Sequence, residues 1–177
     1  MVPNQPPWPR EWLMTDERIG DRLWEAVERL PAGAGIIFRH YDLKDAKRLE
    51  LGLRLAERAN AKQLVLGAAG SRQLAERIGA ALVHNPDGPG SLPWSVAVHD
   101  EAEALAARGA ALVFVAPVFE TRSHPGRVAL GIDRAAELAA LSGSPAIALG
   151  GMDKARFREL RERGFYGYAG IDCWLRI

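Results

Sequence analysis

One short stretch of the sequence has the side chains to bind a phosphorylated ligand. Its residues are Thr121, Arg122, Ser123 and His124. Two hydroxyl groups beside two side chains that can carry positive charge suit charge-assisted hydrogen bonds to a phosphate or pyrophosphate. An exposed polar loop without a ligand is the alternative.

Further polar side chains follow short apolar runs. Arg39 comes after Ile-Ile-Phe, and because a guanidinium cannot lose its charge it must be paired or face a cleft. We expect Arg39 to bind an anion. His84 and His99 also end apolar runs. His84 is either a hydrogen-bonded core histidine or a proton-transfer group, and His99 either serves the site or only orients a turn.

A pair of glycines, Gly150 and Gly151, ends another apolar run just before a predicted helix. Glycines let the backbone approach an oxyanion closely, and the helix N-terminus behind them favours negative charge. The pair is either part of a phosphate site or a tight turn.

Strand-like and helix-like segments alternate along the chain. The predicted strands are 12–15, 35–39, 63–67, 81–84, 94–98, 111–116, 146–150 and 167–171. The predicted helices are 18–30, 43–59, 72–78, 100–109, 134–141 and 154–163. Apolar strands separated by helices indicate a covered parallel sheet, and eight of them favour an α/β fold, a small (β/α)8 TIM barrel with helices 4 and 8 shortened or missing. A doubly wound open sheet is the alternative.

In a barrel the chemistry lies at the carboxyl ends of the strands, where all four histidines, His40 included, fall in this assignment. Four aspartates stand where a helix N-cap is wanted, and we expect them to cap: Asp16, Asp42, Asp100 and Asp153.

The composition limits the class of protein. The 177 residues suit a single domain, 1–177, with a flexible Pro-rich segment at 1–10. Lys plus Arg is 23 and Asp plus Glu is 22, which argues against nucleic acid as a partner. One cysteine, no apolar leader and no membrane-length apolar run predict a soluble cytoplasmic protein. Missing helices would expose apolar surface, so we expect that a homo-oligomer could cover it.

Several segments resemble the thiamine phosphate synthase family and its thiazole tautomerase relatives. Val115 to Thr121 resembles the family's Gly-Pro-Val-Phe-x-Thr segment. Arg39 resembles the arginine of a Gln-x-Arg-x-Lys motif, and Ala148 to Met152 resembles Ala-x-Gly-Gly-Ile. Val83-His84 and Val98-His99 resemble the Gly-Val-His and Ser-x-His segments.

The resemblance implies a (β/α)8 barrel that joins hydroxymethylpyrimidine diphosphate to thiazole phosphate and releases pyrophosphate with Mg²⁺. Arg39 would hold the diphosphate, and Thr121 and Ser123 would line the thiazole phosphate region. Backbone groups for that phosphate would come from Gly150, Gly151, Ile171 and Asp172.

The chain also departs from the family pattern. Tyr41 and His124 stand where the family has lysines, and Gly67-Ala68 replaces an Asn-Asp pair that supplies a metal carboxylate. Asp87 is the nearest candidate for a metal ligand, and Pro117 stands where the tautomerase branch has a histidine.

Three hypotheses follow for a small phosphorylated heterocycle as the ligand. The first is a synthase with a divergent site, in which Arg39, Arg122 and His124 replace the lost cations. The second is a proton-transfer enzyme that uses His84, His99 and His124 near neutral pH. The third is a non-catalytic binder of thiazole or thiamine phosphate.

Overall fold

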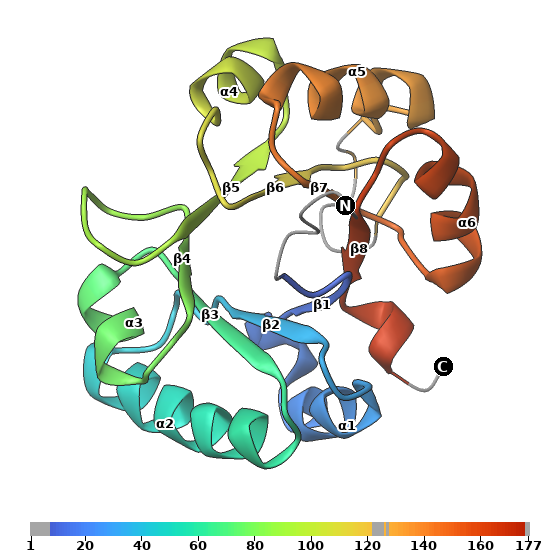
Figure 1. Ribbon diagram of the computed structural model, residues 1–177. Coiled ribbons are helices and arrows are strands. Elements are labelled where there is room, and N and C mark those ends of the chain that lie inside the picture. Colours follow the sequence, from blue (N-terminus) through green and yellow to red (C-terminus); the bar gives the residue numbers. More distant parts are fainter. Residues whose placement is uncertain (1–7, 122–125, 127, 176–177) are drawn as a thin grey trace, which may run out of the picture.

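The computed structural model describes residues 8–121, 126 and 128–175. Eight parallel strands pair in chain order and β8 returns to β1, so the sheet is a closed barrel (Figure 1). The strands are β1 (Glu11–Met14), β2 (Gly35–Phe38), β3 (Val65–Ala69), β4 (Leu82–His84), β5 (Trp94–Val98), β6 (Leu112–Val115), β7 (Ala146–Leu149) and β8 (Gly167–Gly170). The predicted barrel is confirmed, and the open sheet is wrong.

Helices surround this barrel on the outside (Figure 1). Within the described ranges they are α1 (Arg22–Arg29), α2 (Asp45–Ala61), α3 (Arg72–Arg77), α4 (Glu101–Ala106), α5 (Ile132–Ser142) and α6 (Lys154–Glu162). No helix follows β4, and β8 is followed by a single 3₁₀ turn, η2 (Asp172–Trp174). The prediction that the fourth and eighth helices of the barrel are shortened or missing is therefore confirmed.

Aromatic side chains fill the barrel interior. Trp12 and Phe114 are fully buried and meet edge to face, with ring centroids 5.8 Å apart. Gly35 has to be a glycine, because a Cβ there would lie 2.3 Å from the Trp12 ring. The interior is therefore packed, and open space is confined to one end.

Two of the differences from the sequence prediction have a clear cause in the backbone. Strand β3 runs two residues further than expected because Gln63, with φ of 56°, ends α2 in a left-handed turn and delays the strand. The helix predicted over 18–30 is split into a 3₁₀ turn, η1 (Glu17–Ile19), and α1, because Gly20 has φ of 48°. The carboxyl end of β3 thus lies at Ala69.

Three of the four predicted caps are confirmed. The side chains of Asp16, Asp100 and Asp153 accept backbone N–H groups at the starts of η1, α4 and α6. Asp42 is not a cap, and that prediction is wrong. Helix α2 begins three residues later, at Asp45, and the N–H of Asp42 donates to Oε1 of Glu17 at 2.9 Å.

Arg72 organises the connection 85–93, which replaces a fourth helix. Its Nε donates to the carbonyl oxygen of Gly88, and its Nη1 donates to that of Leu92 at 3.3 Å. Arg72 thereby ties a Pro- and Gly-rich loop to the start of α3.

Replacing Arg72 with Met should lower the free energy of unfolding by about 1 kcal/mol, since two partly buried hydrogen bonds are lost while the methylene stem is kept. Urea unfolding measures the effect, and limited proteolysis should cut the connection 85–93 faster than in the wild type. Arg77→Met, at the end of the same helix, is the control. Equal stability and proteolysis of all three proteins would contradict this account of the loop.

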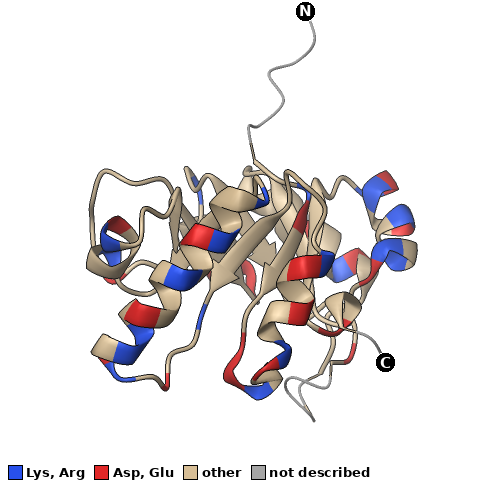
Figure 2. Cartoon of the chain, turned by 90° about the horizontal axis from the view of Figure 1, so that it is seen from below, with Lys and Arg blue, Asp and Glu red and all other residues tan. Residues whose placement is uncertain are grey.

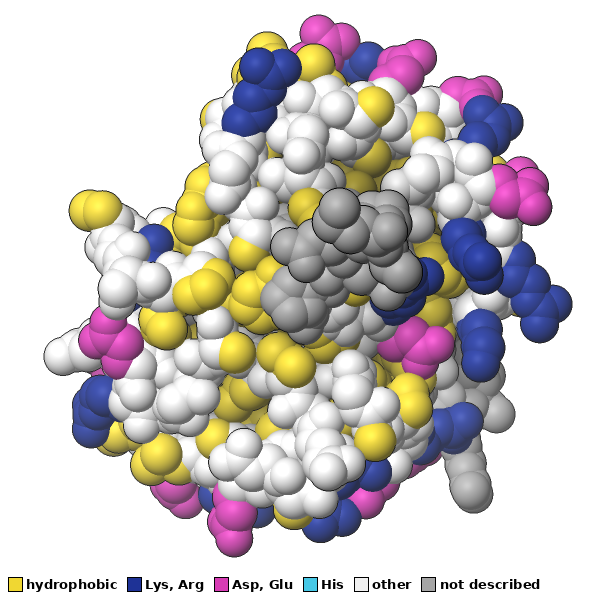
Figure 3. All heavy atoms as spheres, viewed as in Figure 1, with side chains coloured by type: hydrophobic (Ala, Val, Ile, Leu, Met, Phe, Trp, Pro, Cys, Tyr) yellow, Lys and Arg dark blue, Asp and Glu magenta, His cyan; other side chains and the backbone are white. Residues whose placement is uncertain are grey.

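Residues 8–10 close the other end of the barrel. The Nε1 of Trp12 donates to the carbonyl oxygen of Pro9 at 2.7 Å, and the N–H of Tyr168 donates to that of Arg10 at 2.8 Å. The predicted flexible segment 1–10 is therefore wrong for these three residues, and residues 1–7 lie outside the described ranges. Figure 3, which looks onto this end, shows no described histidine side chain on the surface.

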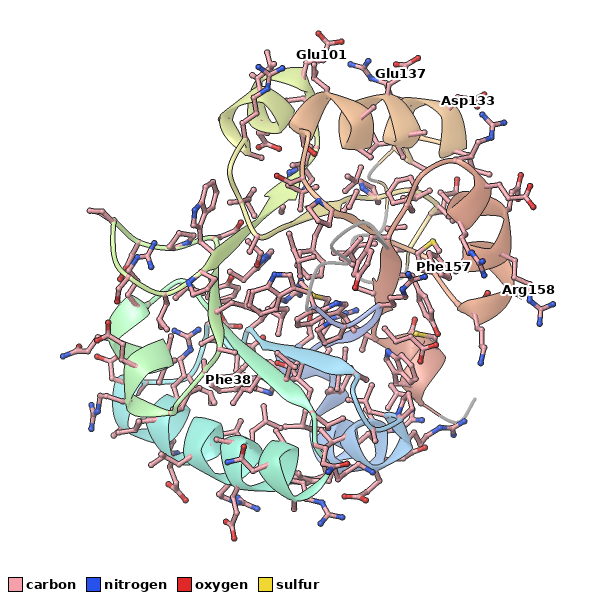
Figure 4. All side chains as sticks on the ribbon, viewed as in Figure 1. Phe38, Glu101, Asp133, Glu137, Phe157 and Arg158 are labelled. Carbon is pink, nitrogen blue, oxygen red and sulfur yellow. The ribbon has the colours of Figure 1, made fainter. Side chains whose placement is uncertain are left out.

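Charged and apolar surface are distributed unevenly. Figure 2 shows acidic and basic positions mainly on the helices and in the loops of its lower end, where the strands have their carboxyl ends. Figure 4 shows Glu101, Asp133 and Glu137 on the outer sides of α4 and α5.

Where a fourth helix is absent, Trp94 and Val96 of β5 are only partly buried. No described helix is long and apolar enough to cross a membrane.

Candidate functional site

A cavity of about 790 Å³ lies at the carboxyl ends of the strands. It brings together nine of the residues predicted from the sequence: Arg39, Tyr41, His84, His99, Thr121, Gly150, Gly151, Ile171 and Asp172. Arg122, Ser123 and His124 lie outside the described residues. Asp87 does not line the cavity, because it is exposed and accepts the N–H of Arg72 at the start of α3.

Arg39 borders the cavity beside β1. Its Nε donates to the carbonyl oxygen of Thr15 at 3.1 Å, and its Nη2 donates to Oδ2 of Asp16 at 3.0 Å. Burial alone would raise the pKa of Asp16, but hydrogen bonds from Arg18 and the charges of both arginines hold that pKa below its ordinary value. Arg39 is therefore ion-paired and also lines the cavity, so both possibilities that the sequence left open, pairing and facing a cleft, apply.

Tyr41 is held at the mouth by a residue that the sequence analysis missed. The guanidinium of Arg48, from α2, lies 5.3 Å from the centre of the Tyr41 ring. Its Nη2 donates to the carbonyl oxygens of Arg39 at 3.0 Å and Ala69 at 2.8 Å. Arg48 thus joins the ends of β2 and β3 and supports both Arg39 and Tyr41.

His84 is a core histidine. It is 3% exposed, its Nδ1 lies 3.1 Å from Oγ of Ser95, and its ring meets Phe114 edge on. Burial lowers the pKa of His84 to about 3, with smaller contributions from the charges of Arg39 and His99. His84 is therefore neutral near pH 7, which favours the core histidine of the two alternatives. His40 is also buried, and it pairs with Oγ1 of Thr15 outside the cavity lining.

His99 forms a pair with Glu103 of α4. Oε2 of Glu103 accepts the backbone N–H of His99 at 2.7 Å and lies 2.8 Å from its Nδ1. A carboxylate only accepts hydrogen bonds, so Nδ1 carries the proton and Nε2 is the nitrogen left for exchange. Of the two cavity histidines that the structure describes, His99 is the one arranged for proton transfer.

The turn after β7 has the form of an anion site. Gly150 and Gly151 have φ of 97° and 60°, and a Cβ on either would lie less than 3 Å from the loop after β6. Neither glycine donates its N–H to an acceptor within the described part of the chain. Since α6 begins just behind them, at Lys154, these N–H groups form a concave donor set of the kind that binds phosphate.

Charge on the described lining is mostly negative. It includes six carboxylates, which are Asp16, Glu17, Asp42, Glu120, Asp153 and Asp172, against two guanidiniums, Arg39 and Arg156. Anions therefore have two cationic positions on this lining, one beside β2 and one beside β7. Apolar side chains, among them Met14, Ala97 and Leu149, complete the wall.

Arg156 and Cys173 are cavity residues that the sequence analysis did not name. Arg156 was predictable, because the third helical residue after the Asp153 cap is directed back toward the loop before the helix. No sequence signal distinguishes Cys173. Burial raises the pKa of its thiol to about 12, so it is a poor nucleophile at neutral pH.

The described residues do not offer a preformed magnesium site. The end of β3, where the resemblance led us to look for a carboxylate, consists of Ala69 and Gly70 rather than Gly67-Ala68, and neither pair has one. Across the described ranges, no three His, Cys, Asp or Glu side chains cluster closely enough to hold a metal ion. The described cavity residues therefore do not by themselves fit a bound Mg²⁺.

Two comparisons with known proteins concern the amino-acid sequence. Residues 88–173 match the family model of thiamine monophosphate synthase. Over almost its whole length, the chain is 27% identical to a protein of Aquifex aeolicus (strain VF5) that is provisionally named thiamine-phosphate synthase 2, covering 94% of this chain and 98% of that one. By both comparisons the chain is similar to the thiamine monophosphate synthase family.

Solved structures support the fold. A thiamine phosphate pyrophosphorylase from Pyrococcus furiosus is similar with a TM-score of 0.78 at 20% identity, over 95% of this chain and 87% of that one. A HpcH/HpaI aldolase/citrate lyase family protein from Burkholderia cenocepacia J2315 has a TM-score of 0.63 at 15% identity, over 95% and 90%. At such identities the likeness concerns the barrel alone.

Proposed function

We propose that the chain joins hydroxymethylpyrimidine diphosphate to thiazole phosphate and releases pyrophosphate. The observation that carries this proposal is a single cavity with two separate anion positions, Arg39 on one side and the Gly150-Gly151 turn on the other. A volume of about 790 Å³ lies within the range of small-molecule sites. Similarity to the thiamine monophosphate synthase family supports the same reaction.

In the proposed reaction, the bond between the pyrimidine methylene carbon and the diphosphate oxygen breaks, and its electron pair leaves with pyrophosphate. The nitrogen lone pair of the thiazole then captures the pyrimidine cation and forms the new C–N bond. Arg39 neutralises charge on the departing pyrophosphate, and a group already in place does so without reorganisation.

The remaining cavity residues fit the other demands of this reaction. Met14 and Leu149 are apolar and limit access of water to the reactive cation. The carboxylates of the lining favour the positive charge of the pyrimidine cation and of the thiazolium product. Thr121 and the backbone of Gly150, Gly151 and Ile171 bind the thiazole phosphate.

Release of pyrophosphate tests this proposal in steady state. We expect pyrophosphate to form only when both substrates are present, because the thiazole captures the cation. Omission of either substrate is the control. Release without thiazole phosphate at the same rate would identify a hydrolase and contradict the proposal. A protein that is stabilised by thiazole phosphate without any turnover would be a binder.

Proton transfer on a phosphorylated heterocycle is the second candidate, and the contacts between His99 and Glu103 favour it. If it operates, Glu103→Gln should slow deuterium uptake from D2O into thiazole phosphate about 10- to 100-fold, since a positioned acid–base group contributes at least that much. Glu101→Gln, on the same helix but paired with Arg134, is the control. Uptake no faster than without enzyme would exclude this candidate.

A further inference from the structure

We infer that Arg156 determines the specificity of the cavity for a phosphorylated thiazole over the unphosphorylated alcohol. This inference rests on the proposed function and identifies the side chain that recognises the phosphate. Arg156 lies in the first turn of α6 and contributes one of the two guanidiniums on the described lining.

Two contacts orient the guanidinium of the exposed residue Arg156. Its carbon lies 4.7 Å from the centre of the Phe119 ring, and its Nη1 donates to the carbonyl oxygen of Gly151. The side chain therefore spans the loops that follow β6 and β7. An arginine held on an aromatic face keeps its planar donors oriented, so less conformational entropy is lost when they bind a ligand.

The charge of Arg156 is not neutralised within the described part of the chain. Arg39 is paired with Asp16, whereas no described carboxylate forms an ion pair with Arg156. Arginine has five N–H donors, and the single side-chain hydrogen bond of Arg156 to a described residue uses one of them. The others can bind phosphate oxygens beside the N–H groups of Gly150 and Gly151.

A phosphate at this turn would therefore meet a full positive charge as well as backbone dipoles. The surrounding carboxylates repel a phosphate dianion, so without Arg156 the turn would bind it weakly. The alcohol lacks that charge and does not need the guanidinium. Arg156 thus binds the phosphate group, which only one of the two ligands carries, and not the thiazole ring that both share.

The test is the affinity of two ligands, thiazole phosphate and the thiazole alcohol, for wild type, Arg156→Gln and Arg158→Gln by calorimetry. Figure 4 shows Arg158 on the side of α6 that faces away from the barrel, which makes it a matched control. Loss of a charge-assisted contact should weaken thiazole phosphate binding to Arg156→Gln about 10- to 100-fold and leave alcohol binding unchanged. The control variant should match the wild type.

Two results would overturn the inference and are distinguishable from failure of the proposed function. If wild type prefers the phosphate and Arg156→Gln keeps that preference, Arg156 does not read the phosphate, while the synthase proposal stands. If the affinities for the phosphate and for the alcohol fell equally in Arg156→Gln, the role of Arg156 would be structural. If wild type binds neither ligand, the inference and the proposed function both fail.

Discussion

Arg39→Ala is expected to lower kcat/KM for formation of thiamine phosphate by about 100- to 1000-fold, the cost of removing one preorganised charged donor from a developing anion. Arg39 is held by Thr15 and Asp16 before any ligand arrives, so its charge is already in position. Both the affinity for the diphosphate and the rate of its departure should fall. Steady-state kinetics with the diphosphate varied measures the effect.

Arg18→Gln is the matched control for Arg39→Ala. Arg18 also pairs with Asp16, at 2.8 Å, but it does not line the cavity. A variant that disturbs Asp16 without removing the cavity charge should keep kcat/KM within about threefold of wild type, as surface ion pairs contribute little. If Arg39→Ala were no slower than Arg18→Gln, Arg39 would not act on the diphosphate.

The second large effect is a pH-dependent loss of stability that depends on His84. Its pKa is about 3 in the folded protein and about 6.5 in an unfolded chain. Below pH 6.5 the unfolded state therefore binds a proton that the folded state does not, and stability falls as the pH falls toward 3. Between pH 7.5 and pH 5 this one group should cost about 2 kcal/mol.

His84→Asn isolates that effect, because the amide can still bond to Ser95 but does not titrate. Urea unfolding of both proteins at pH 7.5 and pH 5 gives the comparison. The wild type should lose about 2 kcal/mol more than the variant over this interval. His40, whose pKa burial also lowers, is present in both proteins and cancels. Parallel losses would show that His84 is accessible to protons in the folded state.

Periodicity and caps predicted most of the fold because they depend on local rules. Strand β5 lies at 94–98 as predicted, since this mostly apolar run directly follows a Pro- and Gly-rich connection that ends before it. Asp100 and Asp153 begin their helices because a carboxylate satisfies N–H groups that lack partners. The end of α2 was missed because Gln63, a residue with no preference for left-handed backbone, adopts that conformation in this fold.

The candidate site was less predictable, because burial and pairing are properties of the folded chain. His84 and His99 stand at equivalent strand ends in the sequence, yet one is a neutral core group and the other is paired with Glu103. Arg156 was overlooked because an arginine in a helix usually faces solvent, as Arg158 does. Its place in the first turn of α6 directs Arg156 toward the preceding loop, and its contacts with Phe119 and Gly151 hold the guanidinium at the cavity.

Mass spectrometry of a reaction mixture tests directly whether the chain forms thiamine phosphate. Purified protein, hydroxymethylpyrimidine diphosphate, thiazole phosphate and Mg²⁺ would be incubated beside an enzyme-free mixture and an Arg39→Ala mixture. We expect thiamine phosphate above the enzyme-free level with the wild type, and at least about 100-fold less with the variant, because the variant lacks a preorganised donor. Absence of thiamine phosphate, with both substrates shown to bind, would contradict it.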